Sequence, residues 1–526
     1  MFYKWQDEAI KTIIGKSGVI SAPTGSGKTL VSYVWSGLLD IYGNTIKPTS
    51  KVIFTAPIKA LSNERYLDLK SMGFDVGLET GDFKKNESAQ ILCCTQEIYT
   101  LKYAHLPNQK VIIDEFHYIF NDSERARAYI DGLRKTSFDS DILVMSATFG
   151  NPDKIKQYLE ETALREFALY ETESRVTDLV FRRKGVKLYS IHDALVFVFS
   201  KKGAEYIALQ IAKTRREIEP ELKTRLKEIA KILEVVKISD VLYKGVGVYV
   251  GAMLPKEKLL VEMAFRERIL DVVIGTDALS LGVNLPAETV VFGQMAKFID
   301  GPLSKNEFMQ MAGRAGRKGY FNTGYVTYIP KSKCENYSYD TSTLYLETLE
   351  KKCEEAKISV HPSVSKLLKK EVSIETEAKM LITYSLPKRR FRDAVMEIEE
   401  LLRSITHTLG YIKDQKFRKK VKKVLADIWN DEMDVLPNIS IACLFAEGET
   451  PDALEAAEIL RKSERNYLQA LLKIKRMQNR LSNGYKFSGM HKIDMKVNQI
   501  DTSVFGFEEK IEQIKITEEL NKKGEK

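Results

Sequence analysis

The feature that most constrains this chain is the segment 21–29, with the sequence SAPTGSGKT. It follows the apolar run 18–21 and precedes a segment of helical character at 30–39, which is the strand, loop and helix context of a phosphate-binding loop. Glycines in such a loop let backbone N–H groups turn toward phosphate oxygens. Lys28 is suited to neutralising the outer phosphates, and the Thr29 hydroxyl is suited to Mg²⁺.

An ordinary turn rich in Gly and Ser is the alternative interpretation of this segment, and the flanking strand and helix disfavour it. The strict form of the pattern is not met, because Ala22 stands where a glycine is usual. We predict nucleotide contacts from Ala22, Thr24, Gly25, Ser26, Gly27, Lys28 and Thr29.

An acidic string, Asp114-Glu115-Phe116-His117, follows the apolar run 111–113. A carboxylate at the end of a strand can reach Mg²⁺ on the phosphate loop, which suits Asp114. A second carboxylate can orient or deprotonate an attacking water, which suits Glu115, and His117 is placed to sense the nucleotide. Acidic residues are also common caps at strand ends, so the string gains its weight from the loop upstream. No ligand cluster supports a zinc site at His117.

Two later strings add candidates. Ser146-Ala147-Thr148 follows the apolar run 142–145 and alone predicts only a helix cap or a turn. Arg314 and Arg317 each follow a glycine and can lie on one face of a helix start. Arginine forks stabilise charge on a transferring phosphoryl group, although a basic patch on a solvated face is the bland alternative.

Short apolar runs alternate with helical segments, which predicts parallel sheets covered on both faces. The expected strands of a first set are 18–21, 52–56, 91–94, 111–113 and 142–145. Those of a second set are 195–199, 246–250, 272–275, 289–292 and 324–328. We therefore expect tandem α/β domains at 1–172 and 173–332, a mainly helical region at 333–507 and a charged tail at 508–526.

Composition narrows the class of protein further. The net charge of +9 is a mild excess that suits an acidic partner. No apolar run is long enough to span a membrane, and the N-terminus lacks the pattern of a signal peptide. Five cysteines without a C-x-x-C pair argue against a disulfide framework or a structural zinc. We expect no membrane partner and a reducing, cytoplasmic location.

Taken in order, these strings resemble the DExH helicases of superfamily 2 over about residues 1–330, and within them the Ski-two-like branch, the relatives of exosome-associated RNA helicases. The segment 55–64, TAPIKALSNE, is similar to motif Ia of that branch. Segments 80–82 and 95–97 resemble motifs Ib and Ic, 275–286 resembles motif V, and 310–317 resembles motif VI. Gln6, after three aromatic residues, resembles the adenine-reading glutamine of the Q-motif.

The resemblance implies two RecA-like domains with ATP bound in the cleft between them and Mg²⁺ as cofactor. It assigns the ATP site to Gln6, Lys28, Thr29, Asp114, Glu115, Asp277, Gln310, Arg314 and Arg317, with Arg317 as the arginine finger. It assigns the coupling of hydrolysis to unwinding to His117, Ser146, Ala147 and Thr148. It assigns nucleic-acid contacts, mostly to the backbone, to Pro57, Lys59, Gly81, Asp82, Thr95, Gln96 and Thr276.

The chain also departs from the family. It starts at the Q-like segment without the usual N-terminal modules, and Tyr249-Val250-Gly251-Ala252 replaces the family's His-His-Ser/Ala-Gly. The region after 333 is short for the winged-helix and ratchet modules, so we expect a reduced version. The segment 298–303 lies where relatives place a strand-separating hairpin; its Asp300-Gly301 pair signals a turn, and an ordinary loop fits equally well.

Charge is clustered in the C-terminal region. Lys416, Lys419, Lys420 and Lys423 can share one helical face, and Lys462, Arg465, Lys473 and Arg476 have similar spacing. An acidic block at 431–460 lies between them. The faces are either solvated and partly neutralised by that block, or one of them holds a nucleic-acid strand. The acidic block is also a candidate docking surface for a protein partner.

The activity implied by the resemblance is an ATP-dependent 3′→5′ helicase acting on single-stranded RNA or DNA next to a duplex. RNA is weakly favoured, because motif Ia is closest to the RNA-acting relatives. Two alternatives stay open: an ATPase that remodels protein–nucleic-acid complexes without separating strands, and the motor subunit of a defence, repair or decay complex.

Overall fold

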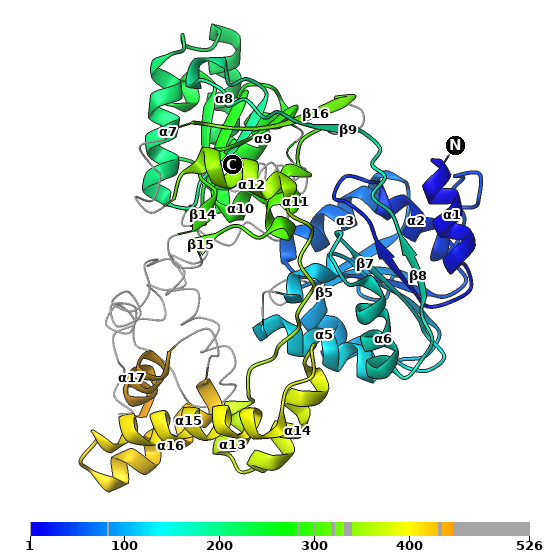
Figure 1. The fold of residues 1–526 in the computed structure, drawn as a ribbon, viewed down its shortest axis with the longest axis vertical. Helices are drawn as coiled ribbons and strands as arrows, with labels where there is room; N and C mark the ends of the chain where they lie inside the picture. Colours follow the sequence, from blue (N-terminus) through cyan, green and yellow to red (C-terminus); the bar gives the residue numbers. More distant parts are fainter. Residues whose placement is uncertain are drawn as a thin grey trace, which may run out of the picture. The chain divides into compact units, whose positions relative to one another are not determined.

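The computed structural model describes residues 2–80, 84–120, 123–251, 253, 255–280, 285, 287–297, 301–316, 321–330, 339–429 and 434–446. These residues form two compact units (Figure 1). The first unit comprises residues 2–118 and 132–356 and contains two α/β domains. The second unit comprises residues 119–131 and 357–446 and is helical.

The first α/β domain is built on an eight-stranded sheet in the order β4-β3-β5-β2-β6-β7-β1-β8. All its neighbouring strands are parallel except β3 and β4. The strands are β1 Gly18–Ser21, β2 Lys51–Ala56, β3 Val76–Glu79, β4 Lys84–Lys85, β5 Ile91–Thr95, β6 Gln109–Ile113, β7 Asp141–Ser146 and β8 Ala168–Glu171. The central strands are buried along nearly their whole length, as their apolar runs predict.

Helices connect these strands, as a parallel sheet requires. They are α1 Lys4–Ile13, α2 Lys28–Trp35, α3 Lys59–Ser71, α4 Gln96–Ile98, α5 Ser123–Lys135 and α6 Pro152–Ala163, with single turns at η1 Tyr99–Tyr103 and η2 Phe116–Phe120. The helix predicted at 30–39 is shorter than expected at its C-terminal end. It ends at Trp35, and Gly37 follows with a left-handed φ of 75°, a conformation that turns the chain away from the helix axis.

The second α/β domain has a six-stranded parallel sheet in the order β11-β12-β10-β13-β16-β9. Its strands are β9 Asp178–Phe181, β10 Ala194–Phe197, β11 Val246–Tyr249, β12 Val272–Gly275, β13 Thr289–Phe292 and β16 Thr323–Tyr328. Its helices are α7 Lys201–Lys213, α8 Pro220–Ile232, α9 Pro255–Arg266, α10 Asp277–Ser280, α11 Lys305–Ala312 and α12 Thr341–Glu350, with single turns at η3 Leu188–Ser190 and η4 Leu242–Lys244.

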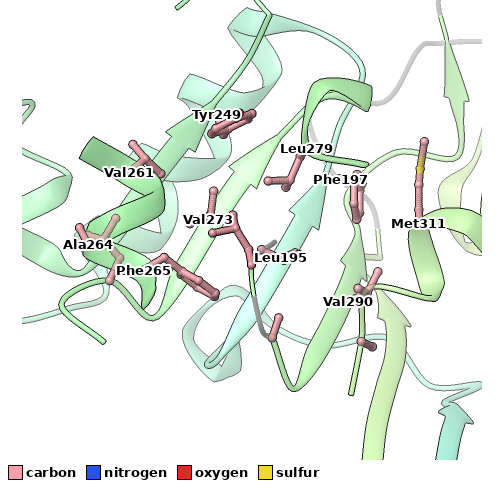
Figure 2. Close-up of a cluster of buried hydrophobic side chains, with 14 of the residues drawn as sticks. Leu195, Phe197, Tyr249, Val261, Ala264, Phe265, Val273, Leu279, Val290 and Met311 are labelled. Atoms are coloured by element: carbon pink, nitrogen blue, oxygen red, sulfur yellow. The ribbon is translucent and has the colours of Figure 1, made fainter. Parts of the chain in front are cut away.

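Aliphatic and aromatic side chains fill the core of this second domain. Leu195, Phe265 and Val273 meet between the sheet and α9 (Figure 2). Phe292 and Phe308 stack with ring centroids 4.7 Å apart, which joins the sheet to α11. This contact therefore fixes α11, which carries the start of the segment resembling motif VI, against the end of β13.

A short antiparallel pair of strands lies around the segment 298–303, for which the sequence allowed either a hairpin or an ordinary loop. Strands β14 Ala296–Lys297 and β15 Gly301–Pro302 pair, and Gly301 has a left-handed φ of 76°. The turn residues 298–300 lie outside the described part of the chain.

The second unit consists of α13 Val364–Leu368, α14 Ile374–Tyr384, α15 Phe391–Gly410, α16 Gln415–Ile428 and α17 Val435–Ala446, together with residues 119–131. The longest of these helices, α15, lies in the region that was expected to be mainly helical. Val421, Val424 and Leu425 of α16 are buried, whereas the four predicted lysines of the basic face are exposed. Arg127 forms an ion pair with the buried Glu377. The second basic block and most of the acidic block lie outside the described residues.

Among the described residues, no helix combines the length and apolar character needed to cross a membrane.

Candidate nucleotide-binding site

The predicted phosphate loop joins β1 to α2. Gly25 and Gly27 have φ values of 78° and 89°, a left-handed conformation that other residues adopt only with strain. The amide of Ala22 donates to the carbonyl of Ser146 over 3.1 Å, which ties the start of the loop to the end of β7. The loop therefore runs directly into the N-terminus of α2, where backbone N–H groups provide a favourable place for an anion.

Lys28 is buried inside the loop that carries it. Its Nζ donates to the carbonyl oxygens of Ala22 at 2.8 Å and Pro23 at 3.1 Å. Burial lowers the pKa of the ammonium, while the nearby Glu115 and Asp114 carboxylates oppose that shift. The ammonium group of Lys28 is thus held inside the loop by two carbonyl oxygens, which the oxygens of a phosphate can replace as hydrogen-bond acceptors.

The acidic pair follows β6, as predicted. The amide of Glu115 donates to Asp114 Oδ1 at 2.9 Å, and Glu115 has a left-handed φ of 52°, which costs about 1–3 kcal/mol for a residue with a side chain. Glu115 Oε2 is buried and has no hydrogen-bond partner among the described residues. Burial, with the adjacent Glu115 carboxylate, raises the pKa of Asp114, and the Arg65 guanidinium opposes that shift.

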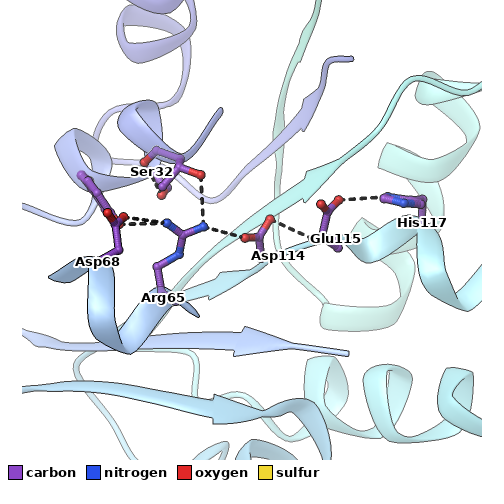
Figure 3. A network of polar contacts seen from close by, with 8 residues as sticks. Ser32, Arg65, Asp68, Asp114, Glu115 and His117 are labelled. Carbon is purple, nitrogen blue, oxygen red and sulfur yellow. Dashed lines mark hydrogen bonds and ion pairs between the residues drawn. The ribbon is translucent and has the colours of Figure 1, made fainter. Parts of the chain in front are cut away.

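Arg65, on α3, lies between the predicted Mg²⁺ ligands (Figure 3). Its Nη2 donates to Thr29 Oγ1 at 3.1 Å and to Asp114 Oδ2 at 3.2 Å. Its Nη1 donates to the Tyr33 hydroxyl at 2.9 Å and to Asp68 Oδ2 at 3.2 Å. Burial alone would lower the pKa of this guanidinium, but Tyr33 and the two carboxylates raise it above its ordinary value.

The residues present suit a Mg²⁺ ion. Thr29 Oγ1 and Asp114 Oδ2 both approach one nitrogen atom of Arg65, so the two oxygens converge on a common point. Hydroxyl and carboxylate oxygens are the donors that Mg²⁺ prefers in phosphate sites.

His117 links the acidic string to the Ser146–Thr148 string. The amide of Ala147 donates to His117 Nδ1 at 3.2 Å. Burial, followed by the charge of Lys28, lowers the pKa of His117 to about 3. The imidazole is therefore neutral, and the 3.4 Å approach of Glu115 Oε2 to Nδ1 is a contact rather than an ion pair.

Gln6 lies against the phosphate loop. Its Nε2 donates to the Gly27 carbonyl at 3.1 Å, and its Oε1 accepts from the Tyr3 amide at 2.9 Å. A Cβ on Gly27 would lie 2.8 Å from Gln6 Nε2, so this contact requires a glycine at 27.

The second α/β domain contributes residues on α10, on α11 and after it. Asp277 is the first residue of α10, Gln310 lies on α11, and Arg314 follows α11. The charge of Arg314 also contributes to the low pKa of His117. Arg317 lies outside the described residues, so its predicted role as the finger stays a prediction.

Three of the predicted nucleic-acid residues of the first domain lie at the carboxyl ends of the neighbouring strands β2 and β5. Pro57 and Lys59 follow β2, and Thr95 ends β5, whose register pairs Thr95 with Ala56. The side chain of Gln96 is fully buried and donates to Thr100, so it lies inside the domain.

Two of the remaining predicted residues, Gly81 and Asp82, lie outside the described residues. Thr276 follows β12 in the second domain, and its amide donates to the Tyr249 carbonyl over 3.3 Å.

Two arginines at this site could not be predicted from the sequence. Arg65 directly follows the segment 55–64 that is similar to motif Ia, and its spacing to Asp68 is that of any helical salt bridge. Arg175, between the α/β domains, donates to the carbonyls of Gly313 and Ala315 at 3.3 and 3.0 Å. Burial lowers the pKa of Arg175 to about 10.

Comparison with known proteins places this arrangement in a class. The family model for DEAD/DEAH box helicases matches residues 3–155, and that for the helicase conserved C-terminal domain matches residues 174–319. The fold and the site therefore define the two-domain core of a superfamily 2 helicase. Within that superfamily the chain belongs to the Ski-two-like branch.

Three curated relatives illustrate the branch. The DExH-box ATP-dependent RNA helicase DExH9 of Arabidopsis thaliana is 28% identical over 63% of this chain and 41% of its own length. The exosome RNA helicase MTR4 of Homo sapiens is 27% identical over 62% and 38%. The ATP-dependent DNA helicase Hel308 of Pyrococcus horikoshii is 28% identical over 61% and 50%. The aligned part of the chain thus spans half or less of each relative.

A solved structure agrees in fold. The Mycobacterium smegmatis helicase Lhr, bound to single-stranded DNA and AMP-PNP, superposes with a TM-score of 0.50 at 17% identity, covering 81% of this chain and 60% of that chain.

Proposed function

We propose that this chain is an ATP-dependent nucleic-acid helicase that couples hydrolysis of Mg²⁺-bound ATP to translocation along a single strand. The observation that carries the proposal is the convergence of Lys28, Thr29, Asp114 and Glu115 on one phosphate loop. The relatives whose names record RNA and DNA helicases support the same class of activity.

In the proposed reaction, the phosphate loop and Lys28 bind the triphosphate, and Thr29 and Asp114 hold the ion. Mg²⁺ supplies charge neutralisation at the phosphates once it is bound. The buried, unpartnered Oε2 of Glu115 is placed to accept a proton from a water that attacks the γ-phosphate. His117, neutral and bonded to the Ala147 amide, is placed to pass the change at the acidic string to the Ser146–Thr148 string.

The substrate is proposed to be a single strand of RNA or DNA beside a duplex, with 3′→5′ movement and a weak preference for RNA. Pro57, Lys59 and Thr95 lie at the same carboxyl-terminal end of the sheet as Asp114. This supports a link between nucleic-acid binding and hydrolysis. ATPase activity measured with RNA, with single-stranded DNA and with neither tests this. Stimulation by one nucleic acid supports the proposal, and turnover indifferent to both contradicts it.

A second candidate is an ATPase that remodels protein–nucleic-acid complexes without separating strands. The observation in its favour is the antiparallel pair β14–β15, which has only two residues in each strand. A tailed-duplex displacement assay distinguishes the two, because a remodelling ATPase hydrolyses ATP on the tail and leaves the duplex intact.

A third proposal is that the chain works as the motor of a larger defence, repair or decay complex. The relative named as an exosome helicase supports it, and a pull-down with the acidic block 431–460 deleted tests it. We also propose a cytoplasmic location, supported by the free thiols of Cys93, Cys94 and Cys353.

A further inference from the structure

We infer that Arg65 is a positioning residue whose guanidinium competes with Mg²⁺ for Thr29 and Asp114, an inference that rests on the proposed ATP site. One nitrogen of the guanidinium contacts both oxygens that would hold the ion. Lys28, the other cation beside the acidic pair, donates instead to the carbonyls of Ala22 and Pro23.

The competition follows from distance and charge. Mg²⁺ binds its oxygen ligands at about 2.1 Å, so an ion held by both Thr29 Oγ1 and Asp114 Oδ2 needs the space that Nη2 of Arg65 borders. The positive guanidinium repels a dication at that distance. The ion pair of Arg65 with Asp114 therefore has to loosen when Mg²⁺ binds.

The surroundings of Arg65 provide a second position for it. Nη1 is bonded to the Tyr33 hydroxyl and to Asp68, and Tyr33 in turn donates to Asp68 at 2.5 Å. The guanidinium carbon also lies 5.6 Å from the Tyr33 ring and 5.9 Å from the Phe54 ring. These contacts can keep the side chain in place after Nη2 leaves Asp114. Release therefore breaks only the hydrogen bonds of Nη2, and those of Nη1 remain.

This arrangement has two consequences of opposite sign. Removing the guanidinium frees Asp114 and Thr29, which should strengthen Mg²⁺ binding. Removing the charge of Asp68 takes away the position to which Arg65 retreats, which should hold the guanidinium on Asp114 and weaken Mg²⁺ binding. A purely structural role for Arg65 predicts that both substitutions damage the site in the same direction.

The test measures the Kd of fluorescent ADP in EDTA and in saturating Mg²⁺, and divides the Kd in EDTA by the Kd in Mg²⁺, so that a higher ratio means stronger Mg²⁺ binding. In Arg65→Gln the ratio should rise about tenfold, the worth of one charge-assisted hydrogen bond, and in Asp68→Asn it should fall. Arg65→Lys, which keeps the charge without the fork, should lie between wild type and Arg65→Gln. Lys70→Gln, an exposed lysine on the same helix, is the matched control and should leave the ratio unchanged.

An unchanged or lower ratio in Arg65→Gln overturns the inference, as does a shift of both variants in the same direction. A wild-type chain that binds no ADP under either condition refutes the proposed ATP site itself, so the two failures are distinguishable.

Discussion

The backbone amide of Ala147 donates a hydrogen bond to Nδ1 of His117 over 3.2 Å, and this bond joins the ends of two neighbouring strands. An imidazole that accepts at Nδ1 cannot also be protonated there, which agrees with the lowered pKa of His117. The bond thus connects His117, two residues after the acidic pair, to Ala147, the residue after β7.

His117 should make the protein less stable in acid. Its pKa of about 3 in the folded state lies below the ordinary value near 6.5, so the unfolded chain binds the proton first as pH falls. The stability associated with the neutral imidazole is complete above about pH 6.5 and is lost progressively toward pH 3. At pH 5 the loss should be about 2 kcal/mol. His117→Asn should lose less stability than wild type between pH 7 and pH 5 in chemical denaturation.

The control for this prediction is His105→Asn, since His105 is exposed. An identical pH dependence in wild type and His117→Asn would show that the imidazole is not held neutral.

Glu115→Gln should bind nucleotide nearly as wild type does and slow turnover by about 10²–10⁴-fold, because only the acceptor for the water proton is lost. Lys28→Ala should instead weaken nucleotide binding. Single-turnover hydrolysis together with nucleotide affinity separates the two effects. Glu161→Gln, on the exposed side of α6, is the control. Wild-type turnover in Glu115→Gln would remove this residue from the reaction.

Gly27→Ala should abolish tight nucleotide binding and destabilise the protein by about 1 kcal/mol or more. The new Cβ meets Gln6 Nε2 at 2.8 Å in a left-handed backbone. Gly15→Ala is a matched control, because Gly15 has a similar φ of 71° and no atom within 4 Å of the new Cβ. Both variants should lose stability, measured by thermal unfolding, but only Gly27→Ala should lose nucleotide affinity. Normal affinity in Gly27→Ala would argue against this loop as the phosphate site.

Reversing Lys416, Lys419, Lys420 and Lys423 to Glu should weaken single-strand binding and flatten its salt dependence. The four side chains are exposed on α16, and each phosphate contact contributes about −0.7 to the slope of log affinity against log salt. Basal ATPase should not change, because the substitutions lie outside the phosphate loop and the acidic pair.

Charge reversal of Lys201, Lys202, Lys227 and Lys231, also exposed, controls for net charge. Equal loss of affinity in both sets would assign the effect to overall charge and leave the α16 face as a solvated surface.

Most of the buried strands could be predicted because parallel strands covered on both faces need continuous apolar runs, as in 111–113 and 272–275. The buried strand β3 was not predicted, because Val76–Glu79 interrupts its apolar residues with a glycine and ends on a glutamate. The edge strands β8 and β9 were not predicted. Their residues are half-buried or exposed, because each of these strands lies at an edge of its sheet and pairs on one side only.

The chain's own order of residues determined the phosphate loop, the acidic pair and their place at strand ends, because strand–loop–helix connections are local. Only the tertiary structure decided that Arg65, 49 residues before Asp114, would donate to it, and that Arg175 would bond the carbonyls of Gly313 and Ala315. Contacts of this kind depend on which strands become neighbours and on which way a helix face turns. Those are outcomes of packing the whole domain, and no spacing along the chain encodes them.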